Sequence, residues 1–388
     1  MSTRHYTLPV EQTKWDVPSG NVTVFNWEYD ETRDTLLTLY EKGKEKQWNA
    51  QTRLDWSIDV DPRAQANGPD YYIPIFGSDM WERMTEDERA DVRHHIGAWM
   101  NSQFLHGEQG ALICASKIVQ TVPDMDSKFY AATQVMDEAR HVEMYSKYVQ
   151  DKLELAYPIN PDLKALLNQV IADERWDMTW LRMQVIIEGL ALAAFSLIRD
   201  FSEEPLSKAI NTYVMQDEAR HVAFGRLALR DFYPQLTQKE RDEREAFVVE
   251  ACYLMRNRFM AQEVWERLGL DVERCMAYVE DSDMTQEFRK MLFSRIVPTV
   301  KDIGLWGKQV QRAYADLGVL QYQDVDPDEL QAQDEQIART LDSARGLSPE
   351  DEAGARLAGV DPARALEVQE TIRLGAEGED DAGQGSIA

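Results

Sequence analysis

The sequence has few cysteines, no excess of positive charge and no segment typical of secretion. Three cysteines (Cys114, Cys252 and Cys275) are too few and too scattered for a disulfide framework. With 42 Lys and Arg against 69 Asp and Glu, the net charge of −27 argues against nucleic acid or an anionic membrane surface as partner. No stretch reaches the unbroken apolar length of a transmembrane helix, and the first residues lead into no signal-peptide core. We therefore expect a soluble, cytoplasmic protein.

The C-terminal part of the chain has no aromatic residues. None occurs from Asp324 onward, and acidic residues there outnumber arginines. Such a segment can bury little surface, so 321–388 is predicted to be an acidic tail, weakly helical and then disordered. It either binds a partner or only keeps the protein in solution. Residues 1–30 are predicted to be an irregular arm with a short strand at Val22–Phe25, which leaves 31–320 as the helical domain.

Five residues recur unchanged eighty positions apart. Asp137–His141 and Asp217–His221 are both Asp-Glu-Ala-Arg-His. A Glu and a His three residues apart lie on one face of an α-helix, about one turn from each other. Each pentad can therefore bind a metal ion through two side chains of one helix.

A single glutamate precedes each pentad by the same interval. Glu108 lies thirty residues before Glu138, and Glu188 lies thirty residues before Glu218. A proline at or near each midpoint predicts that each interval is a helical hairpin. Two such hairpins, packed together, place four carboxylates and two imidazoles at one level. The predicted fold is all-α, a ferritin-like four-helix bundle with additional flanking helices.

The ligand types indicate which metals this site would bind. The predicted ligands and catalytic residues are Glu108, Glu138, His141, Glu188, Glu218 and His221. One Glu from each of two helices and a Glu-x-x-His from each of two others is the ligand set of the ferritin-like di-iron and di-manganese proteins. Four glutamates neutralise two divalent ions inside a bundle, and oxygen and nitrogen ligands suit iron or manganese. The alternative is a surface ion-pair pattern, which the apolar residues around all four glutamates disfavour.

On these residues the chain resembles the ferritin-like di-iron carboxylate superfamily. Within it, the chain is most similar to the oxygen-activating members, namely bacterial monooxygenase hydroxylase subunits, acyl-carrier desaturases and the ribonucleotide reductase small subunit. The resemblance implies two Fe ions, or Mn and Fe, with O2 as co-substrate and a homodimer as the assembly.

The resemblance also implies roles for the residues beside the ligands. In the monooxygenase subunits the Asp of one motif hydrogen-bonds the His of the other. Carried over, Asp137 orients His221 and Asp217 orients His141, which serves the free N–H of a ligating imidazole. The arginines of the two motifs would offset the additional carboxylate charge. The alternative is ordinary helix ion pairs among Asp137, Arg140, Asp217 and Arg220.

Three departures from the relatives bear on the type of enzyme. The monooxygenase subunits often have a Thr one turn after the third Glu, where this chain has Leu192. The arylamine N-oxygenases have an additional His one turn before the second Glu-x-x-His. This chain has Val214 there, which argues against that branch. The ligand-binding oxidases cross-link a Tyr to a Val, and Met183 and Gly110 at those positions preclude that bond.

Tyr145 lies one turn after His141, where the reductase small subunit has its radical tyrosine. A tyrosine so close to the metals can be oxidised, although an aromatic residue on a buried helix is more commonly part of the core. The C-terminus lacks the aromatic residue through which the reductase subunit passes its electron, which weakens the radical hypothesis.

The sequence therefore predicts a non-haem di-iron oxidoreductase. The expected activity is an O2-dependent oxidase or monooxygenase acting on a small or carrier-bound organic substrate in an apolar pocket. The chain has no dinucleotide-binding signature and no four-cysteine iron–sulfur motif, so electrons must come from a separate reductase or ferredoxin. The alternatives are a radical-generating protein that uses Tyr145, and a ferroxidase without an organic substrate.

Overall fold

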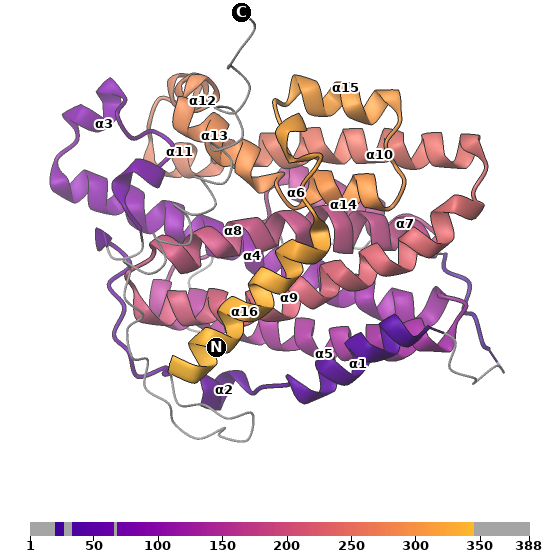
Figure 1. The fold of residues 1–388 in the computed structure, drawn as a ribbon. Helices are drawn as coiled ribbons and strands as arrows, with labels where there is room; N and C mark the ends of the chain where they lie inside the picture. The colour runs from indigo at the N-terminus through magenta and orange to yellow at the C-terminus, as the bar shows by residue number, and fades with distance from the viewer. Residues whose placement is uncertain (1–19, 27–32, 66–67, 345–388) are drawn as a thin grey trace, which may run out of the picture.

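The computed structural model describes residues 20–26, 33–65 and 68–344, and the chain is helical without a strand in these parts (Figure 1). The all-α prediction is confirmed. The short strand predicted at Val22–Phe25 is wrong, because this segment has no strand partner. The N–H of Val24 donates instead to the carbonyl of Gln120 at 2.9 Å. Most of the predicted N-terminal arm and acidic tail lie outside the described residues.

The first ligand-bearing hairpin consists of α4 (Glu86–Thr121) and α5 (Met125–Lys147). Thr85 and Glu88 form a capping box at the start of α4, as their spacing suggests. Pro123 lies in the turn between the helices, where its ring ends α4. After α5 the chain continues as one π-helical segment, η4 (Tyr148–Leu153).

The second hairpin begins with a continuous helical run of three parts. These are α7 (Trp176–Trp180), the π-helical η5 (Leu181–Ile187) and α8 (Glu188–Phe201). The chain then turns into α9 (Pro205–Phe232), which has its proline at the first helical position. The π-helical winding ends where Glu188 begins α8. A π-helical segment at this place is notable because such segments are frequent at functional sites.

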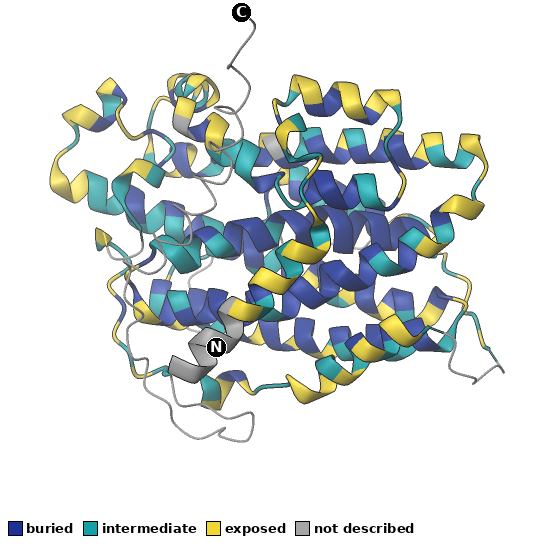
Figure 2. Ribbon diagram, in the orientation of Figure 1, coloured by how far each residue is buried: buried dark blue, intermediate teal, exposed yellow. Residues whose placement is uncertain are grey.

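The run Trp176–Phe201 is long and apolar enough to cross a membrane by length and composition, and 83% of its most apolar window is buried inside the molecule. Arg182 and Glu188 interrupt this run, so it is not the unbroken apolar stretch that the sequence analysis expected to be absent. Figure 2 shows why the apolar length is needed, since the helices at the centre of the bundle carry most of the buried residues.

The other helices surround the bundle. In chain order they are α1 (Asp34–Glu45), α2 (Ala50–Arg53), η3 (Asp70–Tyr72), α3 (Asp79–Arg83), α6 (Pro161–Ala172), η6 (Tyr233–Gln235), α10 (Gln238–Asn257), η7 (Arg258–Met260), α11 (Gln262–Leu268), α12 (Val272–Asp281), α13 (Asp283–Leu292), α14 (Ile296–Asp302), α15 (Lys308–Asp316), η8 (Leu320–Tyr322) and α16 (Pro327–Ala344). Helix α1 packs on α5 and α9, and α10 packs on α6 and α15.

Helix α16 lies across α9 in Figure 1 and contains the first part of the acidic C-terminal segment. Asp334 forms a two-bond ion pair with Arg295 at 2.8 Å, and Asp328 pairs with Arg226. These described residues thus contact the bundle through ion pairs. The boundary drawn between residues 320 and 321 stays a prediction.

Candidate metal centre

The six predicted ligands come together inside the bundle. All are at most 5% exposed: Glu108 on α4, Glu138 and His141 on α5, Glu188 at the start of α8, and Glu218 and His221 on α9. Each hairpin thus contributes one glutamate from its first helix and a Glu-x-x-His pair from its second, as the repeated spacing predicts.

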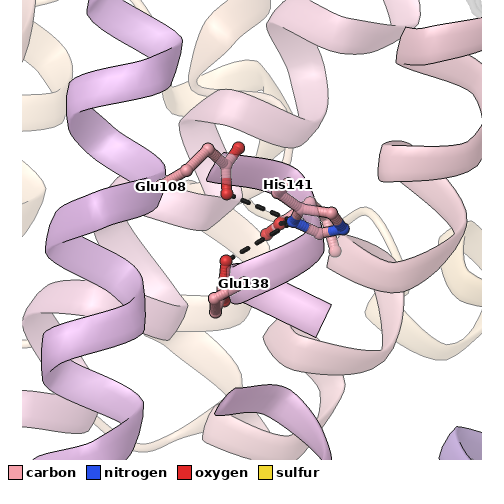
Figure 3. Close-up of side chains that lie close together, drawn as sticks. Glu108, Glu138 and His141 are labelled. Atoms are coloured by element: carbon pink, nitrogen blue, oxygen red, sulfur yellow. Dashed lines mark hydrogen bonds and ion pairs between the residues drawn. The ribbon is translucent and has the colours of Figure 1, made fainter. Parts of the chain in front are cut away.

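His141 is surrounded by three of the carboxylates. Its Nδ1 lies 3.2 Å from Glu108 Oε2, 3.4 Å from Glu138 Oε2 and 3.2 Å from Glu218 Oε1. Figure 3 shows Glu108 and Glu138 pointing at this imidazole from two helices. One ligand atom from each of the four residues lies within 4.8 Å of the others, so the group can hold one metal ion.

A second group lies around His221. Its Nδ1 is 3.2 Å from Glu138 Oε1 and 3.5 Å from Glu218 Oε2. Glu138, Glu188 and His221 offer ligand atoms within 4.8 Å of one another. Glu138 belongs to both groups, and Glu218 reaches both imidazoles. These two carboxylates could therefore serve ions in either group, whereas Glu108 and Glu188 each belong to only one group.

The electrostatics of the cluster depend on positive charge among the carboxylates. Burial, and then the neighbouring carboxylates, raise the pKa of Glu108 and of Glu188 well above the ordinary value. Burial opposes the charged form of Glu138 as well, but the two imidazoles lower its pKa. Burial disfavours charge on His141 and His221, yet the carboxylates raise the pKa of both. So many buried acids need protons, imidazolium or metal cations to neutralise them.

Several atoms of the cluster make no hydrogen bond to the described residues. They are Glu138 Oε2, Glu188 Oε2, both carboxylate oxygens of Glu218, and His221 Nδ1. Buried polar atoms without a partner are rare in folded proteins. All of these point to the same place in the bundle and are metal-ligand types. The residues therefore fit two divalent cations, with the chemistry of a non-haem di-iron or Mn/Fe centre.

The other nitrogen of each imidazole faces an aspartate of the opposite motif. His141 Nε2 lies 3.1 Å from Asp217 Oδ2, and His221 Nε2 lies 3.2 Å from Asp137 Oδ2. This crossed arrangement is the one expected from the resemblance. It holds each ring with Nδ1 toward the carboxylates and Nε2–H toward the aspartate, which is the orientation a ligating imidazole needs.

The arginines of the two motifs lie beside these aspartates. Arg140 Nη2 donates to Asp137 Oδ1 at 2.5 Å and to Asp217 Oδ2 at 2.7 Å. Arg220 pairs with Asp217 Oδ1. Burial opposes the charge on Asp217, but Arg220 and Arg140 lower its pKa well below the ordinary value. Asp217 thus stays available as an acceptor for the imidazole of His141.

Sequence analysis missed two residues that also hold the aspartates. Gln47 Nε2 donates to Asp137 Oδ1 at 2.7 Å, and the indole of Trp48 donates to Asp217 Oδ2 at 2.9 Å. Both lie between α1 and α2, about ninety residues before the first pentad. No local pattern connects them to the motifs, because the packing of α1 on α5 and α9 brings them there.

A third missed residue is Gln134, which is fully buried on α5. Its amide nitrogen lies 3.0 Å from Glu138 Oε1 and 3.0 Å from Glu188 Oε1, and donates to both. The sequence does contain a signal for it. Gln134 lies four residues before Glu138, so it shares the ligand face of the helix.

Tyr145 is buried one turn from His141. Its hydroxyl donates to Asn211 Oδ1 at 3.2 Å, and its ring packs near Phe104 and Phe195. Burial is the main cause that raises the pKa of Tyr145 well above its ordinary value. The side chain is therefore a neutral phenol within an aromatic cluster.

Two neighbouring cavities lie on one side of the cluster, and only the inner one is lined by candidate ligands. The inner cavity, about 30 Å³, is lined by Glu108, Glu188 and Glu218 on the side of the cluster. The outer cavity is about 260 Å³ and mostly apolar, and it shares Ala194 and Phe259 with the inner one. The inner cavity has room for only a water or two, whereas the outer one is large enough for a small organic molecule.

Comparisons with known proteins agree with this geometry. A model of the family described as P-aminobenzoate N-oxygenase AurF matches residues 29–304. No curated protein matches the chain. A solved R2-like ligand-binding oxidase with aerobically reconstituted Mn/Fe cofactor is 18% identical at a TM-score of 0.39, covering 68% of this chain and 98% of its own. The dimanganese(II)-NrdF of Streptococcus sanguinis is 13% identical at a TM-score of 0.42, and the match covers 75% of this chain and 99% of the NrdF chain. At TM-scores below 0.5, neither structure bears on function.

Proposed function

We propose that this chain, which belongs to the P-aminobenzoate N-oxygenase AurF family, uses O2 to oxidise the amine nitrogen of a small aromatic amine. The family makes the chain a non-haem di-iron oxidoreductase, and the amine substrate is the proposal. One oxygen atom would enter the substrate at nitrogen and the other would leave as water, with electrons from an external donor. The observation that supports this most directly is the cluster of buried carboxylates and imidazoles beside a cavity, several of whose ligand atoms make no hydrogen bond.

Membership in this family shows that the expectation drawn from Val214 was wrong. Val214 is fully buried on α9, where an additional histidine was expected for an arylamine N-oxygenase. The family match extends over 29–304, so it depends on the whole helical scaffold rather than on one position. A valine in place of a histidine removes one possible nitrogen ligand from α9 and leaves the helical scaffold intact.

We assign the metal ligands from the contacts. Glu138 and Glu218 would lie between the two ions, and the remaining ligands would complete one ion each: Glu108 and His141, and Glu188 and His221. When bound, the metals supply the reduction of O2 and the oxidising power.

The protein's own part is to hold the ligands and to exclude water. The crossed aspartates fix the imidazoles through Nε2, and Gln134 holds Glu138 and Glu188 through its two amide hydrogens. Residues buried to this degree keep bulk water from the cluster. The substrate would lie in the outer cavity with its reacting end toward the inner cavity, which Glu108, Glu188 and Glu218 line.

The electron donor is proposed to be a separate reductase or ferredoxin. The sequence has no dinucleotide-binding or iron–sulfur motif, and its net charge of −27 suits a donor with a basic surface.

The first test is metal content followed by product analysis. We expect two iron ions per chain after anaerobic loading, and we expect N-oxygenated products when the reduced protein meets O2 and 4-aminobenzoate. Free iron with the same reductant is the control for uncatalysed oxidation. Failure to bind metal, or bound iron with no oxidation of any aromatic amine, would contradict the proposal.

Two alternatives are less well supported. Tyr145 donates to an amide oxygen, which is a poor acceptor for the proton that a phenol loses on oxidation. Tyr145 therefore fits a structural role better than a radical role. The absence of a tyrosyl EPR signal after O2 exposure would support the structural role. A ferroxidase without organic substrate has no need of an apolar cavity of about 260 Å³ next to the inner cavity.

A further inference from the structure

One buried arginine beside the candidate metal centre forms no ion pair. Arg258 lies on η7, between α10 and α11, and is 7% exposed. Among the described residues, its one hydrogen bond goes to the sulfur of Met255, at 3.6 Å, and its Nε is buried without a partner. Its guanidinium carbon lies 5.1 Å from the ring centroid of Phe259. These contacts leave the guanidinium without a bound carboxylate.

The other buried arginines of the described residues differ from Arg258 in this respect. Each forms an ion pair with at least one carboxylate: Arg93, Arg140, Arg182, Arg220, Arg226 and Arg244. Burial lowers the pKa of Arg258 to about 10, and the charge of Asp162 offsets only part of this effect. Arg258 therefore keeps its charge at neutral pH. A buried charge without a partner is costly to the fold, so stability does not account for Arg258.

Arg258 shares the inner cavity with three candidate ligands. Glu108, Glu188 and Glu218 line this cavity, and Arg258 is the one cation among its described lining residues. The cavity volume of about 30 Å³ holds only a water or two. So little water screens charge weakly, and the electrostatic effect of Arg258 therefore extends to the metal positions.

Two divalent ions in this centre would be neutralised without Arg258. The four ligand glutamates supply four negative charges, and Arg140 and Arg220 offset Asp137 and Asp217. The two imidazoles bind metal as neutral rings. Arg258 is thus one positive charge in excess. Oxidation of each ion from Fe(II) to Fe(III) adds a further positive charge, which Arg258 opposes by like-charge repulsion.

We propose that Arg258 raises the reduction potential of the bound metal pair and so favours its reduced state. The equilibrium concerned is the transfer of two electrons from the external donor to two Fe(III) ions, which gives two Fe(II) ions. The reduced pair is the form that can reduce O2, and Arg258 makes this form accessible to a donor of less negative potential. This inference rests on the di-iron centre of the proposed function and is independent of the amine substrate.

The test is a redox titration of the iron-loaded protein without substrate, in the presence of mediators. Mössbauer spectra, which distinguish Fe(II) from Fe(III), give the reduced fraction for the wild type, Arg258→Gln, Arg258→Met and Arg267→Gln. Arg267 is an exposed arginine on the next helix, α11, and is the matched control for loss of one positive charge. Iron analysis and thermal unfolding show whether each variant is loaded and folded.

We expect Arg258→Gln and Arg258→Met to shift the balance toward Fe(III) by about tenfold per electron, a potential lower by about 59 mV. Coulomb's law with an effective dielectric constant of about 20 gives an effect of this size for unit charges about 10 Å apart. The two replacements differ in polarity but both remove the charge, so equal shifts would identify the charge as the cause.

Arg267→Gln should keep the wild-type potential, because the charge of Arg267 is exposed to water and screened. An unchanged or higher potential in both Arg258 variants, or the same fall in Arg267→Gln, would overturn the proposal.

Binding of Mn(II) to the metal-free protein is a second readout that needs no change of oxidation state. Removal of the excess positive charge should tighten Mn(II) binding by Arg258→Gln and Arg258→Met by about tenfold. A purely structural role for Arg258 predicts the opposite, since a distorted site binds metal more weakly. Weaker Mn(II) binding, or variants that no longer bind metal, would therefore contradict the proposal.

Product analysis of the same samples separates this inference from the proposed function. Wild-type protein that binds iron but oxidises no aromatic amine contradicts the proposed substrate, while the potentials still decide the role of Arg258. Wild-type protein that oxidises the amine, with potentials that do not depend on Arg258, contradicts the role of Arg258 alone.

Discussion

The two ligand-bearing hairpins carry the same five-residue motif in different surroundings. Four residues before the motif glutamate, α5 has Gln134 and α9 has Val214, and both are fully buried. Gln134 donates to Glu138 and Glu188. Val214 offers no donor. Glu138 and Glu188 are therefore held by the Gln134 amide, and the equivalent position of α9 has no such amide.

A second pair of equivalent positions differs even more. One turn after the motif histidine, α5 has Tyr145 and α9 has Gly225. The side chain of Gln184 occupies the space that Gly225 leaves free, and its amide nitrogen lies 3.4 Å from Gln134 Oε1. The repeat thus yields a symmetric ligand set with polar amides on one side and an aromatic cluster on the other. We infer that the two ion positions are not equivalent.

The largest expected effect comes from the ligand that both groups share. Glu138→Ala removes the one carboxylate common to the two groups, so each group loses one of its ligands. We expect loss of both ions, measured by metal analysis after loading and desalting. Glu143→Ala changes an exposed glutamate on the same helix and should bind metal like the wild type. Full occupancy in Glu138→Ala would refute the assignment of this residue.

The difference between Gln134 and Val214 can be tested by removing each side chain. Gln134→Ala takes the donors from Glu138 and Glu188, and residues that orient ligands typically contribute about 10–100-fold to metal affinity. We expect Gln134→Ala to bind more weakly the ion held by Glu138, Glu188 and His221, measured by competition with a chelator. Val214→Ala should lower stability without this effect. Equal affinities in the two variants would show that the two sides are equivalent after all.

The space at Gly225 can be tested through stability. A Cβ added there would lie 2.5 Å from Gln184 Cβ, which is close to the backbone and cannot rotate away. We expect Gly225→Ala to lower the free energy of unfolding by about 1–3 kcal/mol, measured by urea denaturation. Gly97→Ala on α4 meets no atom within 4 Å and should raise it by about 0.5–1 kcal/mol. A neutral Gly225→Ala would mean that Gln184 is not held in this place.

The smallest effect is expected at Tyr145. Tyr145→Phe removes the hydrogen bond to Asn211 and keeps the aromatic packing, so unfolding should cost about 1 kcal/mol less. Thermal or urea denaturation measures this loss. Metal content should not change, since Tyr145 is not among the ligands. Loss of iron from Tyr145→Phe would indicate a closer connection with the centre than the structure shows.

The repeated spacing predicted the bundle and the residues that meet inside it. This was possible because the α-helix has a constant period, so residues three or four apart on one helix share a face wherever that helix lies. The capping box at Thr85 and the turn at Pro123 are local in the same sense. The exclusion based on Val214 failed, because a single position inside a helix does not determine the family.

Only the tertiary structure decided what lies around the candidate ligands. Gln47 and Trp48 reach the aspartates because α1 packs on two bundle helices, and Arg258 reaches the inner cavity from a short segment after α10. These residues are distant from the motifs in sequence and follow no period. Their places depend on how helices pack and how connections close, which no local spacing encodes. The sequence by itself therefore determined the scaffold and the candidate ligand set, whereas packing decided the inequality of the two sides and the residues that line the inner cavity.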